Sequence, residues 1–350
     1  MTAKEQLATV KNYIKAKGFA YDDSVIESFY LSLRAKPFVI LAGISGTGKT
    51  QLTRLFAEAI QAEYKLISVC PDWSDSSNLF GYADLNQRFV SGPVINFVKQ
   101  AEDNPEKPHF LCFDEMNLAR VEYYMSDILS VLETRRYDDE RIVTDPIDVN
   151  YGNDTEAADK YGKMTLPDNL YIVGTVNMDE SAFPISKKVL DRANTIEFSH
   201  VDLLSIPDEE LADVDPMEVD ADFLTHEYLT IKDACVKENR EYIKEVCEKL
   251  TLINGILEKA NAQIGYRVRD EIVFYMLNNK KEDLLDETVA FDCQILQKIL
   301  PRVQGSSESV RTMLEELLKL CEDEKYDASA KKLRFMIQRC DVDGFTSYWL

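Results

Sequence analysis

The sequence predicts an α/β fold in which helices flank a parallel sheet, followed by a C-terminal domain made of helices. Up to residue 198, short apolar runs alternate with stretches of helical spacing, which is typical of parallel strands joined by helices. From residue 226 onward the apolar residues recur only at helical spacing. Between these parts, residues 208–222 contain many acids and neither lysine nor arginine, which is typical of a solvated linker.

The first 35 residues predict two helices. Leu7, Val10 and Ile14 recur at helical spacing in the first, and Ser24 belongs to a polar stretch that can cap the second. This stretch is short for a separate recognition domain. We therefore expect an N-terminal helical extension that packs beside the sheet.

The next segment carries a phosphate-binding pattern. Residues 37–42 form an apolar run that predicts a buried strand, residues 43–50 read G-x-x-x-x-G-K-T, and residues 51–60 have the spacing of an amphipathic helix. A strand, a glycine loop and a helix start place backbone N–H groups around a phosphate at the positive end of a helix dipole. Lys49 would reach the β- and γ-phosphates, and the Thr50 hydroxyl would bind Mg²⁺. The residues expected to contact the nucleotide here are Gly43, Ser45, Gly46, Thr47, Gly48, Lys49, Thr50 and Gln51.

Polar side chains follow two further apolar runs. Asp114 and Glu115 come at the end of the first run, and Asn177 ends the second, which begins at Leu170. The carboxyl ends of parallel strands meet at one edge of a sheet, so these groups should lie beside the phosphate loop. There Asp114 would hold the metal and Glu115 would polarise the attacking water, while Asn177 would orient the water or the γ-phosphate.

The remaining chain completes the predicted organisation. Residues 184–198 predict a short helix and a last strand, with Arg192 at the helix end, where a cation also satisfies the helix dipole. We expect an N-terminal extension (residues 1–35), an α/β nucleotide-binding domain (36–205), an acidic linker (206–225) and a helical lid domain (226–350).

Composition excludes several classes of function. The chain has 350 residues with 40 basic and 62 acidic side chains, a net charge of −22, whereas a free-standing nucleic-acid binder usually shows a basic field. The seven cysteines form no C-x-x-C pair and there are three histidines, which argues against a zinc site. No apolar run approaches the length of a membrane span. We expect a cytoplasmic protein without a membrane segment, whose contact with DNA is indirect or made through a pore.

These motifs, in this order, resemble the AAA+ superfamily and, within it, the McrB-like branch of modification-dependent restriction systems, which is related to the MoxR group. The resemblance covers most of residues 35–350. The matching segments are residues 42–50 (AGISGTGKT), 113–120 (FDEMNLAR), 174–180 (GTVNMDE), 189–194 (VLDRAN), 265–271 (GYRVRDE) and 298–306 (KILPRVQGS).

The resemblance implies roles for individual residues. Residues 43–50 look like the Walker A motif, Asp114 and Glu115 like Walker B, and Asn177 like the first sensor. Arg192 is similar to an arginine finger, which acts on the γ-phosphate of a neighbouring subunit. Arg269 resembles the second sensor of MoxR-related members, with Arg267 as the alternative. McrB proteins carry an aspartate three residues after the asparagine; here Asp179 comes two residues and Glu180 three residues after it, and either acid could assist Asn177.

The resemblance further implies hydrolysis of ATP or GTP with Mg²⁺ by a homo-oligomeric ring, expected to be a hexamer, that works with an McrC-like nuclease subunit. ATP is favoured because most relatives in the superfamily use it, whereas McrB proteins use GTP. Founding McrB proteins also add a DNA-reading domain for which the first 35 residues are too short. Two other functions remain open: a MoxR-like chaperone or remodeller of a protein substrate, and a nucleotide-gated scaffold that barely hydrolyses.

Overall fold

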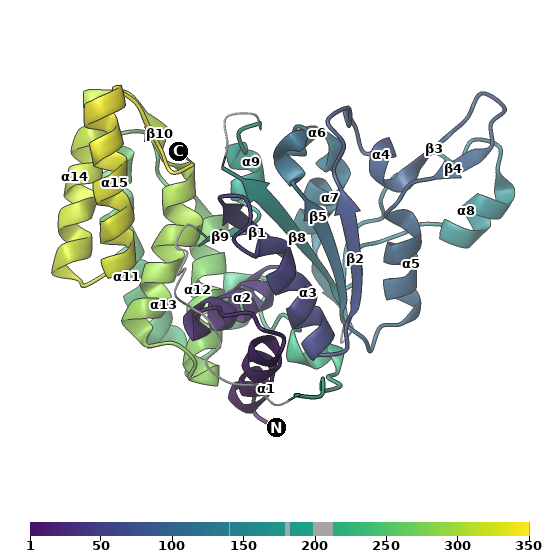
Figure 1. Ribbon diagram of the computed structural model, residues 1–350, viewed down its shortest axis with the longest axis horizontal. Helices are drawn as coiled ribbons and strands as arrows, with labels where there is room; N and C mark the ends of the chain where they lie inside the picture. Colours follow the sequence, from purple (N-terminus) through teal and green to yellow (C-terminus); the bar gives the residue numbers. More distant parts are fainter. Residues whose placement is uncertain (140, 179–182, 199–212, 350) are drawn as a thin grey trace.

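The computed structural model describes residues 1–139, 141–178, 183–198 and 213–349 (Figure 1). Its centre is a five-stranded parallel sheet in the order β2-β5-β8-β1-β9. The predicted α/β fold with a parallel sheet and a C-terminal helical part is therefore confirmed. The strands are β1 (Phe38–Gly43), β2 (Glu63–Ser68), β5 (His109–Asp114), β8 (Leu170–Asn177) and β9 (Asn194–Phe198).

The register of the sheet aligns the carboxyl ends of its strands. Gly43 at the end of β1 pairs with Asn177 at the end of β8 and with Phe198 at the end of β9. On the other side, Ser68 of β2 pairs with Asp114 of β5. The polar residues that follow the apolar runs thus lie along one edge of the sheet, which is where open α/β sheets bind ligands.

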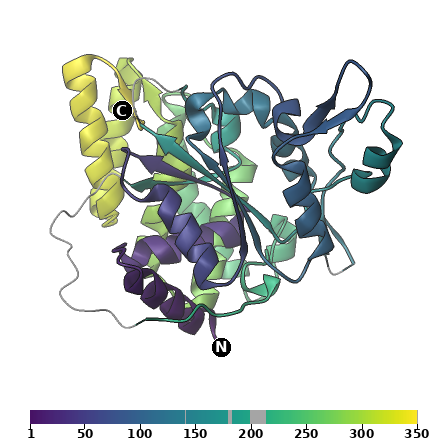
Figure 2. The ribbon, with the colours of Figure 1, turned by 45° about the vertical axis from the view of Figure 1, so that its right-hand side comes forward.

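The two faces of the sheet are covered by different helices because successive side chains of a strand point to opposite faces. On β1, Val39 and Leu41 pack in one core with α1 (Ala3–Ala16), α2 (Asp23–Ala35) and α3 (Lys49–Ala59). Phe38 and Ile40 pack in a second core. Figure 2 shows α1, α2 and α3 together on one side of the sheet. The second core is closed by α5 (Ile95–Asp103), α6 (Val121–Tyr124), α7 (Ser126–Val131) and α9 (Lys187–Leu190).

The C-terminal part is built of helices that pack beside α2 and β9. Its core is continuous with that of α1, α2 and α3, since α12 (Tyr266–Glu282) packs on α2 and the π-helical segment η4 (Ile295–Ile299) packs on β9. No described helix has the length and apolarity needed to cross a membrane. The elements are η3 (Ala221–Phe223), α10 (Ile231–Ala234), α11 (Arg240–Glu258), α12 (Tyr266–Glu282), α13 (Glu287–Gln294), η4 (Ile295–Ile299), η5 (Leu300–Arg302), β10 (Gln304–Gly305), α14 (Glu308–Asp323), α15 (Asp327–Asp343) and β11 (Thr346–Ser347).

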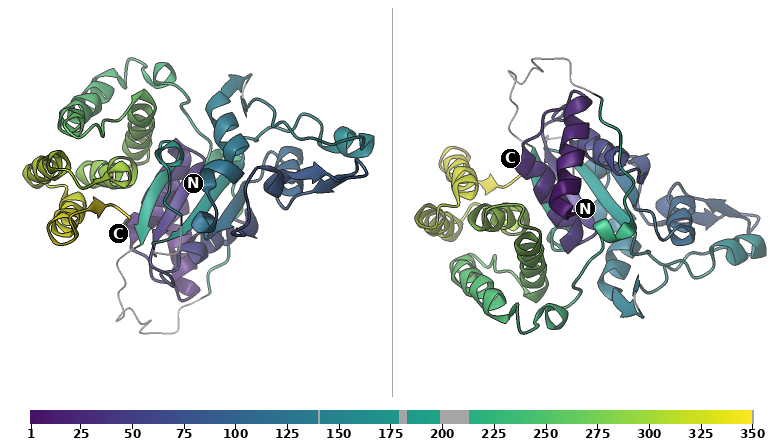
Figure 3. Two further views of the ribbon diagram at one scale, coloured as in Figure 1. Left: turned by 90° about the horizontal axis from the view of Figure 1, so that it is seen from above. Right: turned by 90° about the horizontal axis from the view of Figure 1, so that it is seen from below.

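Two small antiparallel hairpins are inserted in the α/β part. The first lies opposite the C-terminal helices at the far end of the molecule, as the view from above shows (Figure 3). The second follows α7 in the chain. The short elements of this part are α4 (Ser77–Phe80), β3 (Gly81–Ala83), β4 (Phe89–Ser91), η1 (Met116–Leu118), η2 (Leu132–Thr134), β6 (Arg136–Asp138), β7 (Arg141–Val143) and α8 (Thr155–Tyr161).

Candidate active site

The loop between β1 and α3 has a backbone that requires glycine at two positions. Gly43 has φ +154°, and a Cβ there would lie 2.3 Å from the Phe198 carbonyl oxygen. Gly48 has φ +86°, and its Cβ would lie 2.7 Å from the Tyr21 hydroxyl. Only glycine fits both the conformation and the space. The loop therefore turns tightly and leaves the amino end of α3 open to a ligand.

A cavity of about 370 Å³ opens above this loop. It brings together the loop, the ends of β5 and β8, and the connector between α1 and α2. Gly43 lies just below it, at the end of β1. The residues that line the cavity are Phe19, Ser45, Gly46, Thr47, Gly48, Lys49, Thr50, Gln51, Asp114, Glu115, Thr175 and Asn177.

Lys49 is held by the loop itself. Its Nζ donates to the carbonyl oxygens of Gly43 (3.0 Å) and Ile44 (2.6 Å). Burial lowers the pKa of Lys49, and the charges of Asp114 and Glu115 oppose that shift. The amine is hydrogen-bonded to these two carbonyls, and among the described residues no carboxylate forms an ion pair with it. A phosphate in the cavity would supply the missing counter-charge, so the loop fits a nucleotide.

Thr50 and Asp114 form a pair of oxygen ligands. The Thr50 hydroxyl donates to Asp114 Oδ1 at 2.7 Å, and both line the cavity. Mg²⁺ prefers oxygen ligands and is usually held by one or two protein side chains together with phosphates and water. The described residues contain no group of three acids, histidines or cysteines that could hold a metal alone. This donor set fits a magnesium ion that arrives with a nucleotide.

Thr175 links the two acids and was not predicted from the sequence. Its hydroxyl donates to Asp114 Oδ1 at 2.8 Å and accepts from the Glu115 backbone N–H at 2.9 Å. Thr175 and Asn177 stand two residues apart on β8, so their side chains point to the same face. That spacing is the signal that could have identified Thr175.

Glu115 and Asn177 are in direct contact. Asn177 Nδ2 donates to Glu115 Oε1 at 2.8 Å, and Asn177 is fixed in turn by Asn117, whose Nδ2 donates to the Asn177 carbonyl at 3.1 Å. Glu115 has φ +51°, in the left-handed region that residues other than glycine adopt rarely. Such a conformation is common where a side chain must be aimed at a site. Here the turn directs the carboxylate into the cavity.

The connector before α2 supplies two aromatic residues that the sequence did not single out. Phe19 lines the cavity and stacks on Tyr21 with ring centroids 6.4 Å apart. The Tyr21 hydroxyl donates to the Gly48 carbonyl at 2.8 Å, and burial raises its pKa above the usual range. The N-terminal helices are thereby tied directly to the phosphate loop.

The structure places the predicted arginines away from this cavity. Arg192 lies after α9, with Nη1 donating to the Lys188 carbonyl at 2.7 Å and Nε 3.2 Å from Glu133 Oε1. Arg269 pairs with Asp270 (2.6 Å from Nη2 to Oδ1), and its guanidinium lies 4.8 Å from the centroid of the Tyr266 ring. Neither lines the cavity around the phosphate loop. Asp179 and Glu180 lie outside the described residues.

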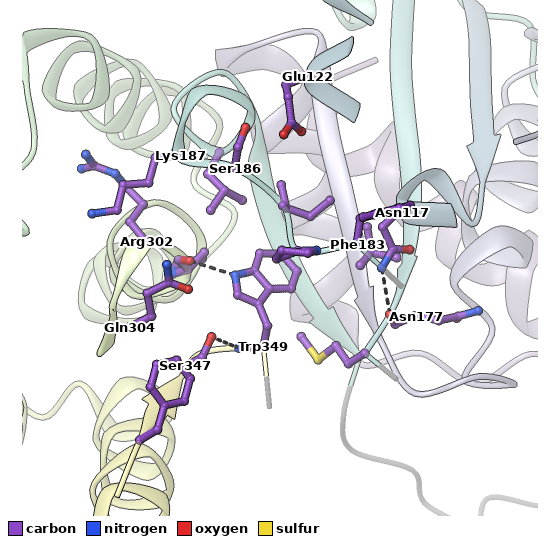
Figure 4. Close-up of a pocket in the computed structure, with 17 residues that line it drawn as sticks. Asn117, Glu122, Asn177, Phe183, Ser186, Lys187, Arg302, Gln304, Ser347 and Trp349 are labelled. Atoms are coloured by element: carbon purple, nitrogen blue, oxygen red, sulfur yellow. Dashed lines mark hydrogen bonds between the residues drawn. The ribbon is translucent and has the colours of Figure 1, made fainter. Parts of the chain in front are cut away.

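A larger cavity of about 550 Å³ lies on the other side of Asn177. Figure 4 shows the Trp349 indole between the Asn117–Asn177 pair and the side chains of Arg302 and Gln304. Trp349 Nε1 donates to the Pro301 carbonyl at 2.9 Å. The end of β8 thus has the phosphate-loop cavity on one side and the C-terminal segment on the other.

Comparisons with known proteins agree with this geometry. Residues 38–193 match the family model of an AAA domain of the dynein-related subfamily, and residues 214–345 match a domain of unknown function, DUF8727. The chain is 26% identical over 188 residues to the type IV methyl-directed restriction enzyme EcoKMcrB subunit of Escherichia coli (strain K12). That match covers 52% of this chain and 38% of the relative.

A second relative is the Lon protease of Clostridioides difficile (strain 630), 26% identical over 268 residues, which are 75% of this chain and 29% of the relative. The chain thus matches less than two fifths of the length of either relative. The AAA model covers β1 with its phosphate loop, the acids at the end of β5, Asn177 and Arg192. Residues 38–193 accordingly form an AAA+ domain with a P-loop, and this part of the chain is McrB-like.

Proposed function

We propose that the cavity above the P-loop binds ATP or GTP with Mg²⁺ and hydrolyses it. The observation that carries this proposal is the continuous set of hydrogen bonds from Thr50 through Asp114 and Thr175 to Glu115 and Asn177. It joins the candidate metal ligands to a candidate base at the mouth of a phosphate loop. The bound metal would neutralise charge on the β- and γ-phosphates.

Each residue of the proposed site then has a defined task. Lys49 would leave the Gly43 and Ile44 carbonyls and donate to the phosphates. Glu115 would accept a proton from the attacking water, because its second carboxylate oxygen is not the one that Asn177 holds. Asn177 would orient that carboxylate and the water. Asp179 or Glu180 remains a candidate to assist.

Turnover would require a second copy of the chain. Arg192 does not line the cavity of its own chain, so it is available to the γ-phosphate bound by a neighbour. A head-to-tail contact of this kind generates a ring when the rotation closes, and we propose a hexamer. Arg267 shares Glu133 with Arg192, whereas Arg269 pairs with Asp270, so we take Arg267 as the lid arginine that acts with Arg192.

For the biological role, we propose the motor subunit of a McrB-like restriction system in the cytoplasm. The identity to the EcoKMcrB subunit supports this, as does the absence of a recognisable nuclease constellation among the residues. Cutting would belong to a McrC-like nuclease partner. With a net charge of −22, contact with DNA would be indirect or confined to the pore of the ring.

Two observations favour a second candidate, a MoxR-like remodeller of a protein substrate. The net charge of −22 disfavours DNA, and the match to the Lon protease covers three quarters of this chain. A remodeller would use the same cavity and the same ring. It would differ in what stimulates turnover, since a protein rather than DNA would raise the rate.

The test is steady-state phosphate release with ATP and with GTP in parallel, with Lys49→Ala as the matched blank. We expect Lys49→Ala to lower turnover by more than about a hundredfold, because it removes the cation that meets the phosphates. Turnover that survives the substitution would contradict the assigned site. GTP preference with stimulation by DNA and a nuclease partner supports the restriction motor, and ATP preference with stimulation by protein alone supports the remodeller. Nucleotide binding without turnover in the presence of every partner would support the scaffold instead.

A further inference from the structure

Two arginines that are far apart in the sequence share one carboxylate. Glu133, in η2 after α7, lies with Oε1 3.2 Å from Arg192 Nε and with Oε2 2.7 Å from Arg267 Nε. Arg192 belongs to the α/β part and Arg267 to the first turn of α12 in the helical part. Glu133 therefore joins the candidate arginine finger to the helical part through a single side chain.

The surroundings of Glu133 contain more cations than carboxylates. Lys36, only 10% exposed, lies 3.5 Å from Glu133 Oε1 and 3.1 Å from Glu271 Oε1. Glu271 also pairs with the fully buried Lys298 at 2.5 Å. The two carboxylates, Glu133 and Glu271, thus face four cations: Arg192, Arg267, Lys36 and Lys298. Arg135 lines the adjoining cavity of about 180 Å³ and is a fifth cation, without an ion-pair partner among the described residues. Asp270, which is paired with Arg269, lines the same cavity, and the charges of Glu271 and Asp168 partly offset that of Arg135. An excess of partly buried cations favours an additional anion.

The arginines have donors to spare. Arg192 Nε and Glu133 Oε1 are close, yet neither atom makes an aligned hydrogen bond in the described structure. Arg267 remains 39% exposed at its side chain. A guanidinium carries five N–H donors, and its fork matches a phosphate as well as a carboxylate. A doubly charged phosphate group binds such a fork more strongly than a carboxylate does.

We propose that Glu133 is a placeholder for the γ-phosphate of a neighbouring copy's nucleotide. In the free chain its carboxylate holds Arg192 and Arg267 side by side; in the assembly the phosphate displaces it and takes both arginines. This inference rests on the proposed function, in which Arg192 acts on a neighbour. Its consequence is that Glu133 competes with assembly, and that nucleotide binding by a neighbour breaks a link between the α/β and the helical parts.

The test is the dependence of phosphate release per copy on protein concentration, measured for the wild type and for Glu133→Gln. Glutamine keeps the shape and one acceptor oxygen but removes the competing charge. We expect the concentration at half-maximal activity to fall about fivefold, the factor that a partly exposed ion pair is worth, while the maximal rate stays within about twofold. Glu106→Gln is the matched control, since Glu106 pairs with the exposed Arg141 at 3.1 Å, and it should change neither value.

An unchanged or higher half-maximal concentration would overturn the inference, and so would loss of turnover in a Glu133→Gln protein that still melts cooperatively and binds nucleotide. Should Glu133→Gln fail to fold, Glu133→Asp serves, because its shorter side chain withdraws the carboxylate from both arginines; the same direction of shift, but a smaller one, is required. If wild-type activity per copy does not depend on concentration, or survives Lys49→Ala, the proposed function itself has failed and this inference falls with it. If those two controls behave as expected and only the shift is missing, this inference alone is wrong.

Discussion

The P-loop cavity and the Glu133 cluster, which consists of Glu133 with Arg192, Arg267, Lys36, Glu271 and Lys298, are both suited to phosphate, but they are built in opposite ways. The cavity is lined by the α/β part and by Phe19 of the N-terminal connector, and hydrogen bonds from Thr50, Thr175 and Asn177 satisfy its acids. The Glu133 cluster joins two parts of the fold, is held by ion pairs, and leaves cations in excess. The difference indicates that the first is a nearly complete binding site and the second is half of one.

The largest effects are expected from removing either the arginine finger or the base. We expect Arg192→Ala to lower turnover by about a thousandfold or more, since an arginine finger is worth about 10³–10⁵. Glu115→Gln should lower it by about 10²–10⁴ through loss of the base. Both variants should still bind nucleotide. Arg141→Ala, an exposed arginine paired with Glu106, is the control and should keep full activity.

Mixing the two inactive variants decides whether Arg192 acts across copies. In a mixed ring, a Glu115→Gln copy can offer its arginine to an Arg192→Ala copy whose base is intact. About a quarter of the interfaces in a random equimolar ring would have this arrangement, so about a quarter of the wild-type rate should return. A mixture as inactive as its components would show that Arg192 serves its own chain, and the Glu133 cluster would then not be half a site.

The buried end of the cluster is expected to affect stability. Burial raises the pKa of Glu271, but Lys298 and Lys36 outweigh it, so the pKa lies below its ordinary value and Glu271 is ionised. Lys298→Met would leave that buried carboxylate with Lys36 alone. We expect a loss of about 3 kcal/mol in the free energy of unfolding, measured by urea denaturation. Lys259→Met, which removes an exposed pair with Glu316, should cost less than about 1 kcal/mol. Equal losses would mean that the buried pair contributes no more than a surface pair.

The smallest expected effect is a dependence on pH beside the cluster. Burial, and then the charges of Arg135 and Arg34, lower the pKa of His226 well below its usual range. In the unfolded chain His226 therefore binds a proton near pH 6.5, whereas in the folded chain it stays neutral. The contribution of neutral His226 to the free energy of unfolding is present above that pH and is lost as the pH falls below it.

The loss should be about 1.4 kcal/mol per pH unit between about pH 6 and pH 5. Urea denaturation of the wild type and of His226→Phe over this range measures it, because the difference cancels the other titrating groups. Phenylalanine keeps the ring against Tyr171 without a titratable nitrogen. Parallel pH profiles would mean that His226 is protonated in the folded protein.

The sequence alone determined the α/β fold and the identity of the phosphate loop, and the physical reason is local. A strand, a glycine loop and a helix that follow one another in the sequence adopt the P-loop conformation, and parallel strands bring their carboxyl ends to one edge of the sheet. The positions of Asp114, Glu115 and Asn177 at the ends of apolar runs were therefore enough to predict that they lie beside the loop. The fold brings all three together in one cavity.

Only the tertiary structure decided the contacts between segments that carry no motif. Thr175 and Phe19 enter the cavity because of the packing of β8 and of the connector before α2. Glu133 meets Arg192 and Arg267 because α12 packs on α2 beside the sheet. Such contacts depend on how the helices pack, because nothing in the sequence around one residue indicates which distant residue it will contact. The sequence favoured Arg269 over Arg267 as the second sensor, and only the structure shows that Arg267 contacts Glu133 whereas Arg269 contacts Asp270.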